Sequence, residues 1–192
     1  MDNVILVDCD GVLLNWEYAF DVWMTRKGYK AVAGSSTAYN VSDKYKLTPK
    51  QSKELIRYFN ESAAIGFLPP LRDAIHYVKK LHEEHGYVFH VITSLSDDEA
   101  PGELRKMNLK KLFGETVFEK FVFLDTGADK DEELAKYKGK GYYWVEDKPE
   151  NCAEGVKHGL QALLMEHGHN MHDRTFPLMK NWKDIYHRIT GQ

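Results

Sequence analysis

Two aspartates near the N-terminus are the residues in this sequence best suited to chemistry. Asp8 and Asp10 follow the apolar run 4–7, and Gly11 comes directly after them. Residues two apart in an extended segment project to the same side, so both carboxylates enter one pocket while Gly11 lets the backbone turn away. One carboxylate can then act as a nucleophile and the other can transfer a proton. On its own, such a pair equally fits a turn or a helix cap.

Other polar groups also follow apolar runs. Thr93 and Ser94 offer hydroxyls for a phosphoryl oxygen. Glu146 and Asp147 form a second acidic pair, and Asp147 can complete a Mg²⁺ site because carboxylate oxygens suit that ion. Between these pairs lies Lys130, whose ammonium group can neutralise a carboxylate and a phosphate together. Taken singly, the same residues fit a polar loop, a capped helix start and a solvated lysine.

The apolar runs before these groups predict strands of a parallel sheet joined by crossover helices. Helices are expected at 71–81, where apolar residues recur at helical spacing, at 179–189, and after the first-turn prolines Pro101 and Pro149. In doubly wound sheets, sites lie at the carboxyl ends of the strands, which is where the polar groups fall. Five strands are expected, at 4–7, 88–93, 121–124, 142–145 and 161–165.

A long interval after the first strand interrupts this alternation. Residues 15–67 exceed what a single crossover helix requires, so they predict a small helical cap inserted into a core domain of residues 1–14 and 68–192. Within the cap, 16–27 is expected to be a helix. A second one begins after Thr48, which with Gln51 forms a capping-box pattern.

Composition narrows the function classes. The chain has 192 residues, and its 26 basic against 29 acidic residues give a net charge of −3. No overall basic field is available, so we expect neither nucleic acid nor an anionic membrane as a partner. Cys9 and Cys152 are too few for a disulfide framework. The sequence shows no signal-peptide pattern and no apolar run near the roughly 18 residues of a membrane span, so a cytoplasmic location is expected.

In order along the chain, D-C-D-G-V-L at 8–13, Thr93-Ser94, Lys130 and Glu146-Asp147 resemble the motif set of the haloacid dehalogenase (HAD) superfamily. The resemblance implies an α/β fold, a HAD-like Rossmannoid doubly wound parallel sheet, and Mg²⁺-dependent phosphatase activity. It implies that Asp8 is a nucleophile that forms an aspartyl-phosphate and that Asp10 is the general acid and base. The implied metal ligands are the carboxylates of Asp8 and Asp147 and the backbone carbonyl of Asp10. The phosphoryl oxygens would be held by Ser94 and Lys130, with Thr93 beside them.

Shorter segments are similar to the 5'(3')-deoxyribonucleotidase family. They are 8–17 (DCDGVLLNWE), 66–70 (GFLPP), 146–148 (EDK) and 181–185 (NWKDI). This resemblance implies that Trp16 stacks on a nucleobase and that Phe67 lines the same pocket. The implied substrate is a nucleoside monophosphate, with deoxyribonucleotides preferred. The family is commonly dimeric, so a homodimer is an open expectation.

Two other functions remain open at this stage. One is a HAD phosphatase for another small phosphoester, such as a sugar phosphate or a nucleic-acid 3' phosphate. The other is a phosphate-binding module without turnover, against which the full set of Asp8, Asp10, Lys130 and Asp147 argues. Histidines 167, 169 and 172 fit no standard zinc spacing and are interpreted as part of a polar loop. Lysines 136, 138 and 140 among glycines are likewise interpreted as a solvated loop.

Overall fold

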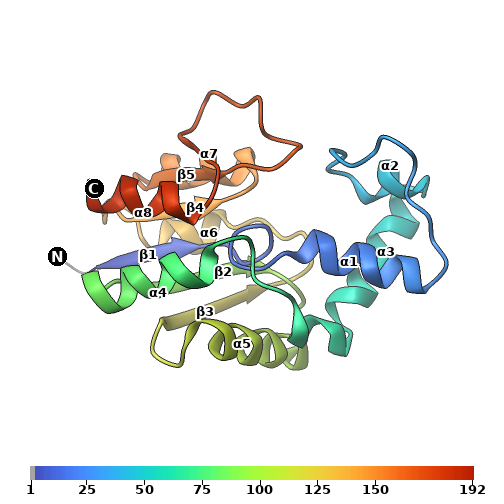
Figure 1. Cartoon of the computed structure of the whole chain (residues 1–192), viewed down its shortest axis with the longest axis horizontal. Coiled ribbons are helices and arrows are strands. Elements are labelled where there is room, and N and C mark those ends of the chain that lie inside the picture. The colour runs from blue at the N-terminus through green and yellow to red at the C-terminus, as the bar shows by residue number, and fades with distance from the viewer. Residues whose placement is uncertain (1–2) are drawn as a thin grey trace.

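Six parallel strands form the centre of the molecule (Figure 1). The computed structural model describes residues 3–192. The strand order across the sheet is β3-β2-β1-β4-β5-β6. The strands are β1 (Val4–Val7), β2 (Val88–Ser94), β3 (Phe118–Leu124), β4 (Tyr143–Glu146), β5 (Gln161–Met165) and β6 (Leu178–Met179). The predicted doubly wound parallel sheet is confirmed.

Helices connect the strands, as the sequence predicts. In chain order they are α1 (Trp16–Arg26), α2 (Val41–Tyr45), α3 (Pro49–Asn60), the 3-10 helix η1 (Ala63–Phe67), α4 (Ala74–His85), α5 (Glu99–Phe113), α6 (Asp131–Ala135), α7 (Pro149–Lys157) and α8 (Trp182–Thr190). None of the helices in residues 3–192 has the length and apolar character of a membrane span.

The strand count differs from the five expected because of β6, a two-residue strand that pairs with β5. Met179 was expected to begin the last helix, but it lies in β6, and α8 begins only at Trp182. The side chain of Asn181 accepts a hydrogen bond from the backbone N–H of Asp184 and so caps α8. A segment of two paired residues is too short to show a sequence periodicity of its own.

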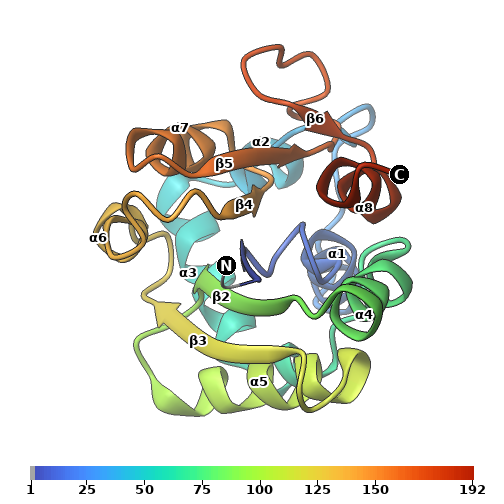
Figure 2. The same ribbon diagram turned by 90° about the vertical axis from the view of Figure 1, so that its left-hand side faces the viewer.

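Alternation along the strands divides the core into two layers. Ile5 and Val7 pack with residues of α4, α5 and α8, whereas Val4 and Leu6 pack with residues of α6 and α7. Figure 2 shows α4 and α8 on one side of the sheet and α6 and α7 on the other. Both faces are therefore covered, as a parallel sheet requires.

Helices α1, α2, α3 and η1 form the segment 15–67, which we call the cap segment. Helices α1 to α3 lie beyond the carboxyl ends of the strands (Figure 1). The two ends of the cap segment run side by side. The N–H of Asn15 donates to the carbonyl of Pro69 at 2.8 Å, and that of Leu71 donates to the carbonyl of Leu13 at 2.8 Å. The capping box expected at Thr48 and Gln51 is present at the start of α3. The division into core and cap domains stays a prediction, but the chain leaves and re-enters the sheet layer at one place.

Candidate active site

The predicted site residues converge at the carboxyl ends of β1, β2 and β4. A cavity of about 600 Å³ opens there between the sheet and the cap segment. Its walls include most of the residues singled out from the sequence: Asp8, Asp10, Trp16, Thr93, Ser94, Lys130, Glu146 and Asp147. Because carboxyl ends of adjacent parallel strands meet at one edge, residues far apart in sequence become neighbours.

Lys130 is the cation at the centre of this group. Its Nζ lies 2.9 Å from Oδ1 of Asp8 and 2.7 Å from Oε2 of Glu146, and its side chain is 3% exposed. Burial alone would lower the pKa of Lys130, but the charges of the two carboxylates raise it above its ordinary value. The ammonium group therefore stays charged beside Asp8. The alternative lysines 136, 138 and 140 do not line the cavity.

Glu146 has its oxygens occupied by neighbours. Oε1 accepts the backbone N–H groups of Asp147 and Lys148, and Oε2 accepts hydrogen bonds from Lys130 and from the amide of Asn151 at 3.0 Å. The sequence did not reveal this role. Glu146 holds Lys130 in place and fixes the turn into α7.

Asp8 and Asp147 carry the carboxylates that remain for a metal ion. Oxygens of Asp8, Glu146 and Asp147 lie within 4.8 Å of one another. Burial, and then the charge of Glu146, raise the pKa of Asp8 to about 6. Burial, and then the charge of Asp8, raise the pKa of Asp147 to about 7. Crowded carboxylates of this kind fit a hard divalent cation such as Mg²⁺.

Gly11 allows Asp147 to approach the first strand. Its φ is +73°, and a Cβ at this position would lie 2.5 Å from Oδ2 of Asp147. Any other residue would both strain the backbone and displace the carboxylate. The sequence explained Gly11 by the turn alone, and the structure adds the close approach.

The two hydroxyls at the end of β2 have different surroundings. Oγ of Ser94 donates to the carbonyl of Ala128 at 2.9 Å. Oγ1 of Thr93 is buried and has no hydrogen-bond partner. An unpartnered buried hydroxyl is unfavourable by about 1–3 kcal/mol unless a ligand satisfies it. Both residues line the cavity, and Ser94 is the more exposed of the two.

Arg105 of α5 is a site residue that sequence reasoning missed. Its side chain is fully buried, and Nη1 donates to Oδ1 of Asp10 at 2.6 Å. Leu109 and Phe113 follow Arg105 at helical spacing and are buried too. That spacing was a usable signal, because a charged residue on the buried face of a helix needs a buried partner.

The cap side of the cavity is aromatic. Trp16 stacks on Phe20 with ring centroids 4.7 Å apart, and its Nε1–H donates to Oδ1 of Asn60 at 2.9 Å. Phe67, in contrast, does not line the cavity, and 69% of it is exposed. Gly66 beside it packs closely on Leu104 of α5, which leaves the following side chain on the surface. The structure thus brings Trp16 but not Phe67 to the expected pocket.

Two histidines of the loop after β5 border the cavity. Nε2 of His167 donates to the carbonyl of Gly11 at 2.6 Å, and Nε2 of His169 lies 3.2 Å from the carbonyl of Asp147. The rings are stacked, and Tyr39 of the cap segment contacts His169 with centroids 4.6 Å apart. His172 does not line the cavity. The Nε2 atoms of both histidines thus face backbone carbonyls, which agrees with a polar loop.

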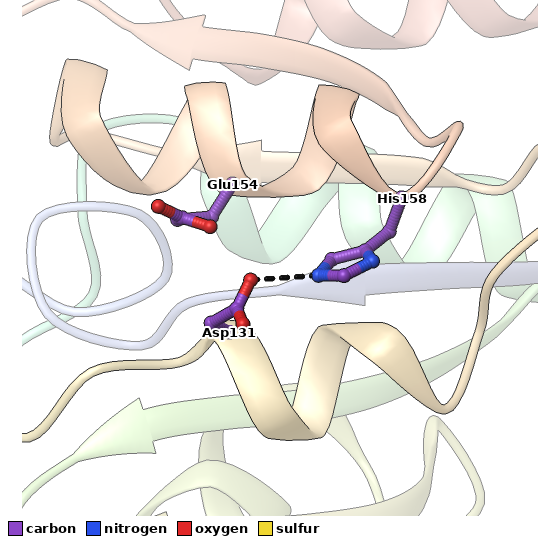
Figure 3. A group of neighbouring side chains, drawn as sticks. All are labelled: Asp131, Glu154 and His158. Atoms are coloured by element: carbon purple, nitrogen blue, oxygen red, sulfur yellow. Dashed lines mark hydrogen bonds and ion pairs between the residues drawn. The ribbon is translucent and has the colours of Figure 1, made fainter.

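A second cluster of carboxylates and histidine lies between α6 and α7 (Figure 3). Nε2 of His158 lies 2.7 Å from Oδ1 of Asp131, and Lys157 bridges Asp131 and Glu154 at 3.0 and 3.2 Å. The hydrogen bond from His158, followed by contacts with Glu154 and Lys157, lowers the pKa of Asp131. Since Lys157 already supplies a cation, the cluster is an ion-pair network that joins the two helices.

No family model matches the sequence. The chain is 25% identical over 162 residues to an uncharacterised 32.4 kDa protein of the Gp30-rIII intergenic region of Enterobacteria phage T4. That match covers 79% of this chain and 56% of the phage protein, so the chain spans about half the length of this curated relative.

Solved structures resemble the whole chain. A haloacid dehalogenase-like hydrolase, SP0104 from Streptococcus pneumoniae, matches with a TM-score of 0.65 at 13% identity, over 98% of both chains. The D,D-heptose 1,7-bisphosphate phosphatase of B. bronchiseptica, complexed with magnesium and phosphate, matches with a TM-score of 0.56 at 10% identity, again over 98% of both chains. Together with the strand order and the position of the cap segment, these matches show that the chain has the fold of the HAD-superfamily hydrolases.

Proposed function

We propose that this protein is a Mg²⁺-dependent phosphomonoesterase that hydrolyses nucleoside monophosphates, with deoxyribonucleotides preferred. The observation that carries the proposal is the pairing of Asp8 with buried Lys130, beside the carboxylate of Asp147. A nucleophilic carboxylate, a fixed cation and carboxylates that can bind a metal ion suit phosphoryl transfer through an aspartyl-phosphate. The magnesium and phosphate of the similarly folded heptose bisphosphate phosphatase support the same chemistry.

The reaction proceeds in two displacements. An oxygen of Asp8 attacks the phosphorus, the bond to the leaving oxygen breaks, and Asp10 gives that oxygen a proton. Water then attacks the aspartyl-phosphate, Asp10 takes a proton from the water, and the bond to Asp8 breaks to release phosphate. Throughout, Ser94 and Lys130 hold phosphoryl oxygens, with Thr93 beside them.

Mg²⁺ fits the carboxylates of Asp8 and Asp147, with the backbone carbonyl of Asp10 as the third protein ligand. When bound, it would neutralise the charge shared by the phosphate and the nucleophile. Gly11 leaves room for the Asp147 carboxylate that would bind this ion.

The nucleotide part of the proposal rests on Trp16. Its ring and that of Phe20 line the same cavity as Asp8, Asp10 and Asp147, and a volume of about 600 Å³ holds a substrate larger than phosphate. Aromatic faces bind nucleobases of any identity. A second candidate substrate is a sugar phosphate. The observation that favours it is the similarity in fold between this chain and the heptose bisphosphate phosphatase.

The test is phosphate release by the purified protein from deoxyribo- and ribonucleoside 5'- and 3'-monophosphates, sugar phosphates and p-nitrophenyl phosphate. Turnover that requires Mg²⁺ is expected to fall by roughly 10³-fold or more in Asp8→Asn, because the nucleophile is lost. Asp97→Asn, at an exposed position, is the matched control. Full activity of Asp8→Asn would refute the mechanism.

Substrate class is tested with Trp16→Ala. We expect the KM for a nucleotide to rise about tenfold, in line with 1–3 kcal/mol for one stacked base, and the KM for glycerol phosphate to change little. Trp23→Ala is the control, since Trp23 belongs to the same aromatic cluster but does not line the cavity. Turnover of sugar phosphates alone would select the second candidate.

A further inference from the structure

Arg105 is a buried cation that pairs with Asp10 and lies beside the Cys9 side chain. Nη1 lies 2.6 Å from Oδ1 of Asp10, and Nη2 lies 3.4 Å from Oδ2. The arginine side chain is 0% exposed, and its Nε has no hydrogen-bond partner. Burying an ion pair adds little net stability, and leaving Nε unpartnered subtracts from it. The arrangement therefore serves orientation better than it serves stability.

The helix that carries Arg105 is itself firmly placed. On α5, Asn108 donates to the carbonyl of Leu68 at 3.1 Å, and Leu104 packs against Gly66 at the end of the cap segment. The helix that carries the guanidinium group thus also contacts the segment in which the chain returns from the cap segment to the sheet. A rigid donor of this kind restricts a carboxylate to one rotamer.

The two oxygens of Asp10 are held unequally. Oδ1 accepts the short bond from Arg105, whereas the only contact of Oδ2 among the described residues is the longer one. Asp10 lines the cavity and 23% of its side chain is exposed, so the carboxylate is accessible from the substrate side. Oδ2 is therefore the oxygen available for proton exchange.

We propose that Arg105 is a positioning residue that anchors Oδ1 of Asp10 and thereby presents Oδ2 to the leaving-group oxygen and then to water. This inference rests on the proposed function. In the first step, the proton moves from Oδ2 to the leaving oxygen as the phosphorus–oxygen bond breaks. In the second step, Oδ2 takes a proton from the attacking water. Arg105 exchanges no proton and touches no substrate.

The consequence depends on the leaving group. A poor leaving group such as phenolate needs the proton from Asp10 as the bond breaks, whereas p-nitrophenolate leaves with little help. Loss of the anchor should therefore reduce kcat/KM for phenyl phosphate and spare kcat/KM for p-nitrophenyl phosphate, because kcat/KM reports the first chemical step. The second step needs Asp10 for either substrate, so the aspartyl-phosphate should accumulate.

The experiment compares wild type, Arg105→Met, Arg105→Lys and Lys106→Met on these two substrates with Mg²⁺. Lys106 is the matched control because it is the next residue of α5, is partly exposed and pairs with Glu103 instead of Asp10. In Arg105→Met we expect the ratio of kcat/KM values, p-nitrophenyl over phenyl, to rise at least about tenfold. A burst of p-nitrophenolate equal to the enzyme concentration should precede steady state. Arg105→Lys should restore part of the ratio.

A comparison of two other variants covers the case in which Arg105→Met does not fold. The double variant Asp10→Asn with Arg105→Met removes both charges of the pair, and its kcat/KM for phenyl phosphate should equal that of Asp10→Asn alone. A further loss in the double variant relative to Asp10→Asn, or an equal loss for both substrates in Arg105→Met, would overturn the inference. Wild-type protein that turns over neither these substrates nor nucleotides would instead overturn the proposed function.

Discussion

At the residue scale, Gly11 shows how one missing side chain shapes the site. Its backbone lies in the left-handed region, and the space of its absent Cβ is taken by the Asp147 carboxylate. Position 11 therefore requires glycine for two reasons, the left-handed backbone and the close approach of Asp147. They can be separated because Gly28 also has positive φ, at +85°, but has nothing within 4 Å of a Cβ.

Gly11→Ala is expected to lower both stability and activity. The left-handed backbone makes alanine unfavourable by about 1–2 kcal/mol, and displacement of Asp147 should reduce phosphate release by roughly 10–100-fold. Gly28→Ala should lose similar stability and keep its activity. Thermal unfolding and phosphate release measure the two effects, and equal activities of the two variants would refute the close-approach interpretation.

A second residue-scale point concerns Asp147, whose raised pKa makes the stability of the folded protein depend on pH. The folded protein holds a proton on Asp147 up to about pH 7, whereas an unfolded chain releases it near the ordinary value of 3.8. Between these values the folded state binds more protons than the unfolded state. The stability of the metal-free protein should therefore fall as pH rises from about 4 to 7.

Asp147→Asn should consequently stabilise the metal-free protein at pH 8 and make its pH dependence between 4 and 7 shallower. Added Mg²⁺ should raise the Tm of wild type and leave that of Asp147→Asn nearly unchanged, because binding to the folded state alone stabilises it. Thermal unfolding across pH, with and without Mg²⁺, checks both. A variant that is less stable than wild type at pH 8 without metal would contradict the expectation.

At the element scale, α7 lies against β4 at a contact that only glycine permits. A Cβ at Gly155 would lie 2.5 Å from Cδ1 of Trp144. The Trp144 ring is fully buried, and its Nε1 donates to the carbonyl of Asn151 in the same helix at 3.0 Å. Neither the ring nor the helix can move away without breaking this bond. The position of α7 matters because Asp147 and Glu146 directly precede it.

Gly155→Ala is expected to destabilise the protein by about 1–3 kcal/mol through overpacking. Helix propensity alone predicts the opposite sign, a gain of about 1 kcal/mol. Urea unfolding decides between them. Val156→Ala is the control at the next, 51% exposed position, where a change within about 0.5 kcal/mol is expected. An unchanged or increased stability of Gly155→Ala would show that the helix and the ring can adjust.

At the scale of the whole molecule, the cap segment touches the core on the far side of the cavity. Tyr39 contacts His169, and Thr37 lies so near Gly168 that a Cβ there would approach its Cγ2 to 3.0 Å. Together with the paired ends of the segment near Asn15 and Pro69, these contacts enclose the cavity from two sides. Contacts that narrow a cavity reduce the access of water that would compete with the substrate.

Tyr39→Ala is therefore expected to raise the KM for the substrate several-fold and to change kcat less, because the enclosing contact is lost while Asp8 and its neighbours stay in place. Tyr18→Ala is the matched control, since Tyr18 is an equally exposed tyrosine of the cap segment outside the cavity. Steady-state kinetics provides the comparison. The same KM in Tyr39→Ala and wild type would exclude a role for this contact in binding.

The sequence by itself determined the sheet and the grouping of its chemistry. Apolar runs of strand length ended in Asp8, Thr93 and Glu146, and parallel strands bring such ends to one edge whatever the loops do. Helix starts such as Thr48 were also readable, because capping depends on residues three apart. These features follow from short-range patterns.

Only the tertiary structure decided which groups pair. Arg105 pairs with Asp10, which lies 95 residues away in the sequence. Glu146 accepts a hydrogen bond from Lys130. Phe67 lies on the surface instead of in the pocket. Such pairings depend on how the helices pack on the sheet. The spacing of residues along the chain does not reveal which distant residues this packing brings together. The physical reason is that the choice of a buried partner is made by packing and by the need to satisfy a buried charge, both of which act between segments far apart in the chain.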